Sequence, residues 1–240
     1  LFCLALFISH IVNCQSPCLT RIKEEAKKID TISYSTGTGF LINSQGYILT
    51  NRHVIERSKE LYVTFYVNGK KNRLKAKIDG WSAYNDIAII KVDINGIFPK
   101  KPNIYFSSKE LKAGDEIFTL GYPSPDYLGN KIKITNGIIN STSGFQDDEK
   151  SYQISAPIQP GNSGSPLCDK YGNIRGIIVA SFQKGQNVNY AIKGEIIKLL
   201  SKSGNINLPE ITSNESINAK ISSLQSTVCL IENVSEKVYY

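Results

Sequence analysis

Several protein classes are excluded by what this sequence has little of. Its 240 residues include only two histidines, His10 and His53, and this excludes a histidine-rich metal site. Cys18, Cys168 and Cys229, the cysteines after the first 14 residues, follow no zinc-binding spacing, so we predict no metal and no other cofactor. Beyond the first dozen positions, no apolar run approaches the roughly 20 residues of a membrane-spanning helix. We therefore expect no membrane span once that first segment is removed.

The charge balance is basic but dispersed. Lysine and arginine number 28 against 21 aspartates and glutamates, a net charge of +7. The basic residues are scattered, and Gly69–Lys77 is their only notable cluster. We predict a solvated lysine-rich face and no nucleic-acid binding, with polyanion binding through the lysines near Lys70 as the alternative. The composition, 41% hydrophobic and 20% charged, is that of a compact globular protein.

The first segment, Leu1–Val12, is apolar and too short to span a bilayer as a helix. It resembles the core of a secretory signal peptide, and cleavage after Cys14 would leave Gln15 as the mature start. We therefore expect residues 1–14 to be a signal peptide and the protein to be secreted or periplasmic. A buried amphipathic edge and lipid attachment at Cys14 are the alternatives.

Removal of the signal would leave three cysteines, which allow one disulfide and one free thiol. These are Cys18, Cys168 and Cys229, and their pairing stays open. Three glycosylation sequons begin at Asn140, Asn214 and Asn233. They have meaning only if the source organism glycosylates its secreted proteins.

The rest of the chain divides into two β-rich halves. Leu19–Asp30 places apolar residues at helical spacing, which predicts a short N-terminal helix within residues 15–32. After it, short β-branched and aromatic runs alternate with turn signals, as is typical of an all-β barrel or sandwich. Asn95–Asn103, which contains Gly and two prolines, interrupts this pattern. We therefore expect two similar halves, 33–97 and 98–200.

The first half contains the predicted strands Gly39–Asn43, Tyr47–Thr50, Leu61–Val67 and Asp86–Val92. The second contains Asp115–Leu120, Lys131–Asn140, Tyr152–Ser155, Asn173–Ser181 and Asn187–Ile192. Lys193–Lys202 has one apolar face and is predicted to be a helix that closes the second half. Residues 201–240 are polar and weakly patterned, so no structure is predicted for them.

Three features, in order along the chain, indicate nucleophilic chemistry. Glycines flank Ser163, and they permit a tight backbone that exposes the hydroxyl and aims N–H groups into one concavity. His53 follows an apolar strand, and Asp86 stands directly before another. A serine nucleophile needs a base within hydrogen-bonding reach and a third group that orients the base. Two neighbouring carboxylates are alternatives for the third group, namely Asp79 and Asp93.

The motifs over about residues 33–200 resemble the successive signatures of trypsin-like serine peptidases of the chymotrypsin fold, with the Deg/HtrA branch closest. They are Thr36–Phe40, Gly46–Val54, Asn85–Ala88, Leu120–Pro123 and Gly161–Pro166. The resemblance implies an all-β fold of two six-stranded antiparallel β-barrels with the active site between them. Two departures stand out: Ser165 occupies a position where most members have glycine, and the roughly 40 residues after Leu200 are too few for the PDZ domain that usually follows.

The resemblance also implies a role for each residue of the constellation. Ser163 would attack a peptide carbonyl, His53 would move the proton and Asp86 would orient the imidazole. The backbone N–H groups of Gly161 and Ser163 would form the oxyanion hole. Proteins or peptides would be the substrates, in extracytoplasmic protein quality control, and a homo-trimer formed through about Thr20–Ser35 is one oligomeric state that the family allows. The main alternative is a catalytically silent binding module with the same fold.

Carried over by position, the resemblance places the substrate pocket at Pro157, Ile158, Val179, Ala180, Ser181 and Val188. Trypsin-type enzymes have an acid at the position of Pro157, whereas no carboxylate occurs here from Gln153 to Ser163. Glutamate-specific relatives use a histidine on the pocket wall, and this wall has none. Val188 would narrow the base of the pocket.

We therefore predict cleavage after small or medium aliphatic side chains. A peptide library digested with the protein should show such residues at the position before the cut. A profile dominated by Arg, Lys or Glu at that position would contradict the prediction.

Overall fold

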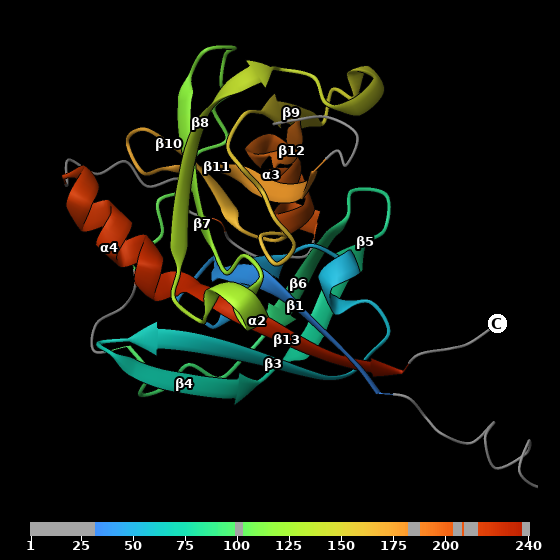
Figure 1. Cartoon of the computed structure of the whole chain (residues 1–240), viewed down its shortest axis with the longest axis vertical. Coiled ribbons are helices and arrows are strands. Elements are labelled where there is room, and N and C mark those ends of the chain that lie inside the picture. Colours follow the sequence, from blue (N-terminus) through green and yellow to red (C-terminus); the bar gives the residue numbers. More distant parts are fainter. Residues whose placement is uncertain (1–31, 99–102, 182–187, 204–207, 209–215, 237–240) are drawn as a thin grey trace, which may run out of the picture. The chain divides into compact units, whose positions relative to one another are not determined.

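The computed structural model describes residues 32–98, 103–181, 188–203, 208 and 216–236, which form two antiparallel β-sheet systems and a few short helices (Figure 1). The predicted signal peptide, the predicted N-terminal helix and Cys18 lie outside the described residues. Ile32, at the end of the segment expected to be helical, is the first residue of a strand.

The first sheet has seven strands in the order β4-β3-β13-β1-β2-β6-β5 and stays open. The strands are β1 (Ile32–Leu41), β2 (Tyr47–Thr50), β3 (Ser58–Val67), β4 (Lys70–Lys75), β5 (Lys77–Ser82), β6 (Ile87–Lys91) and β13 (Val228–Glu236). This differs from the closed six-stranded barrel expected for this half. An extra strand from the far end of the chain, β13, lies between β3 and β1, and β4 and β5 remain as edges.

The second half is a closed barrel of six strands in the order β10-β11-β12-β9-β8-β7, as predicted. Its strands are β7 (Glu116–Gly121), β8 (Lys133–Ser141), β9 (Ser151–Ile154), β10 (Pro166–Asp169), β11 (Ile174–Ser181) and β12 (Asn189–Lys193). Helix α3 (Gly194–Ser203) packs on β11 and β12 and confirms the predicted closing helix. Closure pairs every strand on both sides and removes exposed edges.

Three more short helices occupy the connections. They are η1 (His53–Ile55), α2 (Pro125–Leu128) and η2 (Phe145–Asp147). One continuous cluster of buried side chains runs from the first sheet, through Phe40 and Ile90, to Leu120 and Ile177 of the second barrel. The two halves therefore share a hydrophobic core, and η1 lies where they meet.

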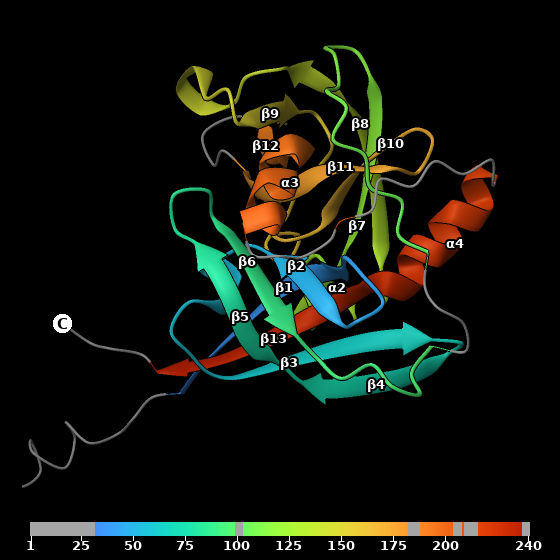
Figure 2. The same ribbon diagram turned by 180° about the vertical axis from the view of Figure 1, so that it is seen from behind.

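Residues 216–236 of the C-terminal segment form a helix and a strand, although their sequence pattern is weak. Helix α4 (Ile217–Thr227) begins after Ser216, whose side chain accepts a hydrogen bond from the Ala219 N–H at 3.3 Å. Strand β13 follows directly and pairs antiparallel with β3 (Figures 1 and 2). Val228 and three further apolar side chains of β13 are buried, namely Cys229, Leu230 and Ile231.

The thiols of Cys168 and Cys229 are free and fully buried. The disulfide that the cysteine count allowed is therefore formed by neither of them. Burial raises the pKa of both thiols well above the ordinary value, so they remain protonated and behave as small apolar side chains.

The basic cluster of the sequence forms the exposed edge of the first sheet. Arg73 pairs with Glu232 at 2.9 Å and Lys75 with Glu60 at 3.3 Å. Part of this positive charge is thus neutralised, as expected for a solvated face. Over the described ranges, no helix combines the length and apolar character needed to cross a membrane.

We predict that a chain shortened after Ser203 loses its folded state. The truncation removes four buried apolar side chains of β13, each contributing about 1.5–3 kcal/mol, and unpairs β3 and β1 in the middle of a sheet. This sum matches the whole stability of a typical domain, about 5–15 kcal/mol. Circular dichroism and thermal unfolding of the truncated chain test it, and a cooperative transition close to that of the intact chain would contradict it.

Candidate active site

The carboxylate of Asp86 holds His53 by two atoms at once. Its Oδ2 lies 2.6 Å from the ring Nδ1 of His53, and its Oδ1 accepts the His53 backbone N–H at 3.0 Å. The imidazole ring and the backbone of His53 are therefore both bound by the Asp86 carboxylate. When Nδ1 carries a proton, the other nitrogen, Nε2, is free to accept one.

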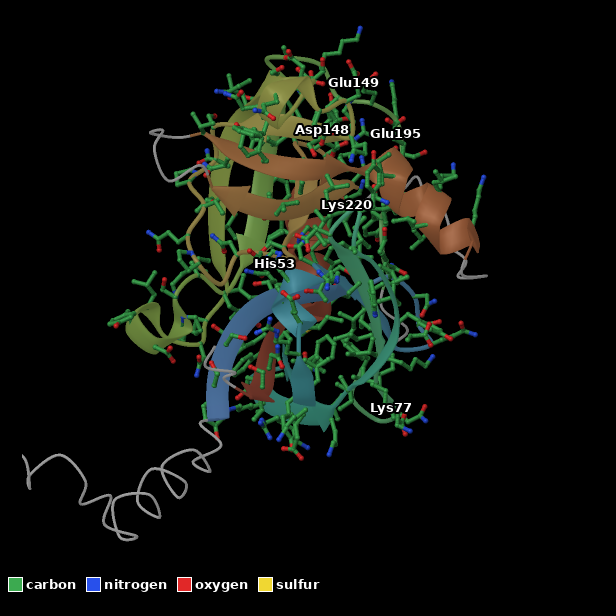
Figure 3. All side chains as sticks on the ribbon, turned by 90° about the vertical axis from the view of Figure 1, so that its right-hand side faces the viewer. His53, Lys77, Asp148, Glu149, Glu195 and Lys220 are labelled. Atoms are coloured by element: carbon green, nitrogen blue, oxygen red, sulfur yellow. The ribbon has the colours of Figure 1, made fainter. Side chains whose placement is uncertain are left out.

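The turn that presents Asp86 is fixed to the loop before η1. Asp86 has φ +49°, a left-handed conformation that aspartate tolerates better than most residues. Its carbonyl oxygen accepts hydrogen bonds from the Asn51 side-chain amide at 3.0 Å and from the Arg52 N–H at 3.2 Å. Four hydrogen bonds thus join Asp86 to residues 51–53. Figure 3 shows His53 on η1, beside the blue strand β1.

Ser163 lies in the loop before β10 and is fixed to both halves. Its carbonyl accepts the Thr38 N–H of β1 at 2.9 Å, and the next N–H, of Gly164, donates to Ile178 of β11 at 3.0 Å. Its hydroxyl donates to the carbonyl of Val179 at 2.9 Å. In this structure the hydroxyl is thus bonded to β11 and not to His53.

Strand β1 contacts both the helix that carries His53 and the loop that carries Ser163. Gly37 packs directly against Val54, the residue after His53, so that a Cβ at position 37 would collide with the Val54 side chain. The next residue, Thr38, donates to Ser163. Adjacent residues of β1, whose Cα atoms are about 3.8 Å apart, therefore contact the helix that carries His53 and the loop that carries Ser163.

The chain before Ser163 makes a type II turn over Gln159–Asn162. The Asn162 N–H donates to the Gln159 carbonyl at 3.0 Å, and Gly161 has φ +95°. Pro160 precedes this glycine, and a proline followed by a glycine with positive φ specifies type II, because proline cannot adopt the positive φ that the other turn types with such a glycine require.

This turn sets the direction of the Gly161 N–H. The Pro160 carbonyl accepts the Ser124 N–H at 2.7 Å, and in a trans peptide the N–H of the next residue points the opposite way. Among the described residues, neither the Gly161 N–H nor the Ser163 N–H has a protein partner. Two unpaired donors two residues apart, next to a serine, can bind an oxyanion.

Thr38 forms hydrogen bonds with the turn before Ser163. Its fully buried hydroxyl donates to the Gly161 carbonyl at 2.7 Å and accepts the Tyr122 N–H at 3.1 Å. The Thr38 carbonyl accepts the Thr50 hydroxyl at 2.8 Å. This one residue therefore links the turn before Ser163 to β2 and to the end of β7, a link that the sequence pattern did not indicate.

A cavity of about 310 Å³ adjoins Asp86 and spans both halves. Tyr84 and Asp86 line it from the first half, and Phe145, Val179 and Tyr190 line it from the second. Its walls are mainly apolar and aromatic. The three aromatic residues were missed by the sequence analysis, although Tyr84 stands only two positions before Asp86.

The predicted pocket residues are only partly brought together. Val179 lines the cavity, Ile158 packs beside the core of the second barrel and Val188 is half-buried. Pro157 is exposed. Ala180 and Ser181 belong to β11, and their side chains lie outside what the structure describes. In the described part of the chain, no group of three or more potential metal-ligating side chains is found.

An all-β fold with a histidine held by a carboxylate, and with a glycine-flanked serine in a loop bound to the same strand that packs against the histidine's helix, is typical of serine peptidases with a chymotrypsin-like fold. The sequence profile of the trypsin-like peptidase domain matches residues 37–177. The chain therefore belongs to the family of trypsin-like serine endopeptidases.

Individual relatives place the chain near the DegP-like branch. A probable periplasmic serine endoprotease DegP-like of Pseudomonas fluorescens is 35% identical over 146 residues, 60% of this chain and 29% of that protein. An uncharacterised protein, y4bJ, of Sinorhizobium fredii is 34% identical over 171 residues, 67% of this chain and 26% of that protein. The chain thus spans about a quarter to a third of the length of these curated relatives.

Solved structures support the fold. The serine endoprotease from Yersinia pestis has a TM-score of 0.59 at 18% identity, covering 87% of this chain and 95% of that one. The crystal structure of Deg5 has a TM-score of 0.57 at 25% identity, covering 77% of this chain and 93% of that one.

We predict that Thr38→Val destabilises the turn before Ser163. Valine keeps the shape of threonine but leaves the Gly161 carbonyl and the Tyr122 N–H without their partner. An unsatisfied buried group costs about 1–3 kcal/mol, so the free energy of unfolding should fall by at least that amount. Urea denaturation measures it, with Thr38→Ser as the control that keeps the hydroxyl. Equal losses in both variants would contradict the role of the hydroxyl.

Proposed function

We propose that this chain is a serine endopeptidase that hydrolyses peptide bonds through an acyl-enzyme intermediate. The observation that carries the proposal is the pair of hydrogen bonds between Asp86 and His53. It is supported by the N–H groups of Gly161 and Ser163, which have no protein partner among the described residues. An orienting carboxylate, a base, a nucleophile and an oxyanion site are the four parts that this mechanism requires.

In the proposed first step, the Ser163 hydroxyl turns from the Val179 carbonyl toward Nε2 of His53. Catalytic hydrogen bonds often tighten only when substrate is bound. As Oγ forms its bond to the substrate carbonyl carbon, its proton passes to Nε2, and Asp86 stabilises the imidazolium. The N–H groups of Gly161 and Ser163 bind the oxyanion, a contribution of about 10² to 10³ in rate for each such donor.

Collapse of the tetrahedral intermediate breaks the C–N bond, and His53 gives its proton to the leaving amine. A water molecule then attacks the ester, with His53 again as base, and releases Ser163 and the new carboxylic acid. Apart from the substrate and this water molecule, these steps use only residues of this chain.

The pocket walls favour apolar side chains in the substrate. Val179 and the aromatic residues Phe145 and Tyr190 line the cavity next to Asp86. This supports the predicted preference for aliphatic residues before the cut, with protein or peptide substrates. The two carboxylates nearest to this pocket are Asp86, which His53 engages, and Asp148, which lies 3.6 Å from the ammonium group of Lys150. Each of these carboxylates already has a partner in the structure.

Extracytoplasmic protein quality control is the setting we propose. It is supported by the apolar first segment and by relatives named periplasmic serine endoproteases. A homo-trimer formed through about Thr20–Ser35 remains a prediction.

A fluorophosphonate probe, which reacts with activated serines, tests the proposed activity. The wild-type chain should be labelled at Ser163, and Ser163→Ala should not be labelled at all. His53→Ala should react at least about 10³-fold more slowly, because it removes the base. A folded wild-type chain that resists the probe would instead support the alternative of a catalytically silent binding module.

A further inference from the structure

A buried asparagine from the C-terminal strand contacts the helix that carries His53. Asn233 lies on β13 and is 2% exposed. Its side-chain nitrogen donates to the carbonyl of Val54 at 3.0 Å and to the carbonyl of Glu56 at 3.0 Å. Val54 is the first residue and Glu56 the third residue after His53, although Asn233 is about 180 residues away in sequence.

Helix η1 depends on outside partners for its shape. It has only three residues, and no side chain caps its N-terminus. A helix this short has no stability of its own, and its last carbonyl groups have no partner within the helix. The single amide of Asn233 supplies donors to two of these groups.

The helix is thus held at both ends. On the N-terminal side, Asp86 accepts the backbone N–H groups of Arg52 and His53, the first through its carbonyl and the second through its carboxylate. On the C-terminal side, Asn233 binds the carbonyls. Gly37 packs beneath the helix against Val54. The direction of the exposed His53 ring is then set by this frame.

The chemistry of position 233 indicates that Asn233 serves as a hydrogen-bond donor and not only as a packing residue. The side-chain oxygen of Asn233 is buried and has no hydrogen-bond partner among the described residues. An unpaired buried oxygen is costly, so an apolar residue would suit a site that served packing alone. The burial of this amide also argues against glycosylation at the Asn233 sequon.

We infer that Asn233, on β13, is a positioning residue for His53. The inference rests on the proposed function for its effect on rate. Its structural core, the dependence of the His53 geometry on Asn233, stands without it.

Asn233→Asp is the sharpest variant, because it keeps the shape and removes both donors. Two controls accompany it. Ile231→Val removes one methylene group from a buried side chain on the same strand. It therefore controls for a modest loss of stability that leaves Asn233 in place. Ser235→Ala removes the sequon and leaves Asn233 in place.

The first measurement is the rate constant for reaction with the fluorophosphonate probe. Misplacement of a catalytic group by about 1 Å can cost about 10²-fold. We expect Asn233→Asp to react about 10- to 100-fold more slowly than wild type, and both controls to stay within about twofold. An Asn233→Asp rate equal to that of the controls would overturn the inference and leave the proposed function intact.

The second measurement does not require activity. The proton between His53 Nδ1 and Asp86 should give a low-field NMR resonance, assigned by its loss in His53→Ala. We expect this resonance to broaden or vanish in Asn233→Asp and to persist in both controls. If wild type fails to react with the probe but this pattern holds, the proposed function fails and the positioning role stands. An unchanged resonance would overturn the positioning role.

Asn233→Ser provides the same test if Asn233→Asp does not fold. Serine is smaller and can donate one hydrogen bond. The rate constant of Asn233→Ser with the probe, and the intensity of its low-field resonance, should therefore be lower than in wild type without being lost. A folded Asn233→Ser chain with wild-type values in both measurements would contradict the inference.

Discussion

The paired hydrogen bonds that the Asp86 carboxylate accepts from His53 are the constraint on which the site depends. One carboxylate fixes both the ring, at 2.6 Å, and the backbone of the same residue, at 3.0 Å. Such a hold needs Asp86 at the end of its turn with φ +49°. The side chains of the pair are 43% and 29% exposed, so the geometry rather than deep burial must set the direction of the ring.

Strand β1 turns two sheet systems into one site. Gly37 allows η1 to approach closely, and Thr38 binds Ser163 through its N–H and the Gly161 carbonyl through its hydroxyl. Gly164 fits against Thr38 from the other side, where any Cβ would collide with the Thr38 carbonyl. Gly164 is therefore required for close packing between the halves, and Gly37 for close packing of η1 on β1 within the first half. Both glycines belong to motifs that the sequence analysis identified, Thr36–Phe40 and Gly161–Pro166.

Much of the fold followed from sequence because buried strands have clear patterns. Strand β2 has the predicted bounds, and the predicted strand at Asp86–Val92 contains β6. The exposed edge strands β4 and β5 were missed, β4 because its lysines resemble a charged surface loop and β5 because Asp79 and Gly80 interrupt its apolar pattern. Strand β13 was missed because its apolar run is short and lies in a polar segment. The closed first barrel was expected from the family resemblance and is wrong, because this half is an open sheet in which β13 lies between β3 and β1. The catalytic candidates were found because glycines and a lone histidine mark them, whereas Thr38 and Asn233 act through partners distant in sequence.

The most direct test of the account is a crystal structure of the chain after reaction with a peptidyl phosphonate. We predict a covalent bond between phosphorus and Ser163 Oγ, with one phosphonyl oxygen within hydrogen-bonding distance of the N–H groups of Gly161 and Ser163. His53 should remain bound to Asp86, with its Nε2 facing the adduct. Attachment at another residue, or an adduct on Ser163 whose oxygens contact neither N–H group, would contradict the account.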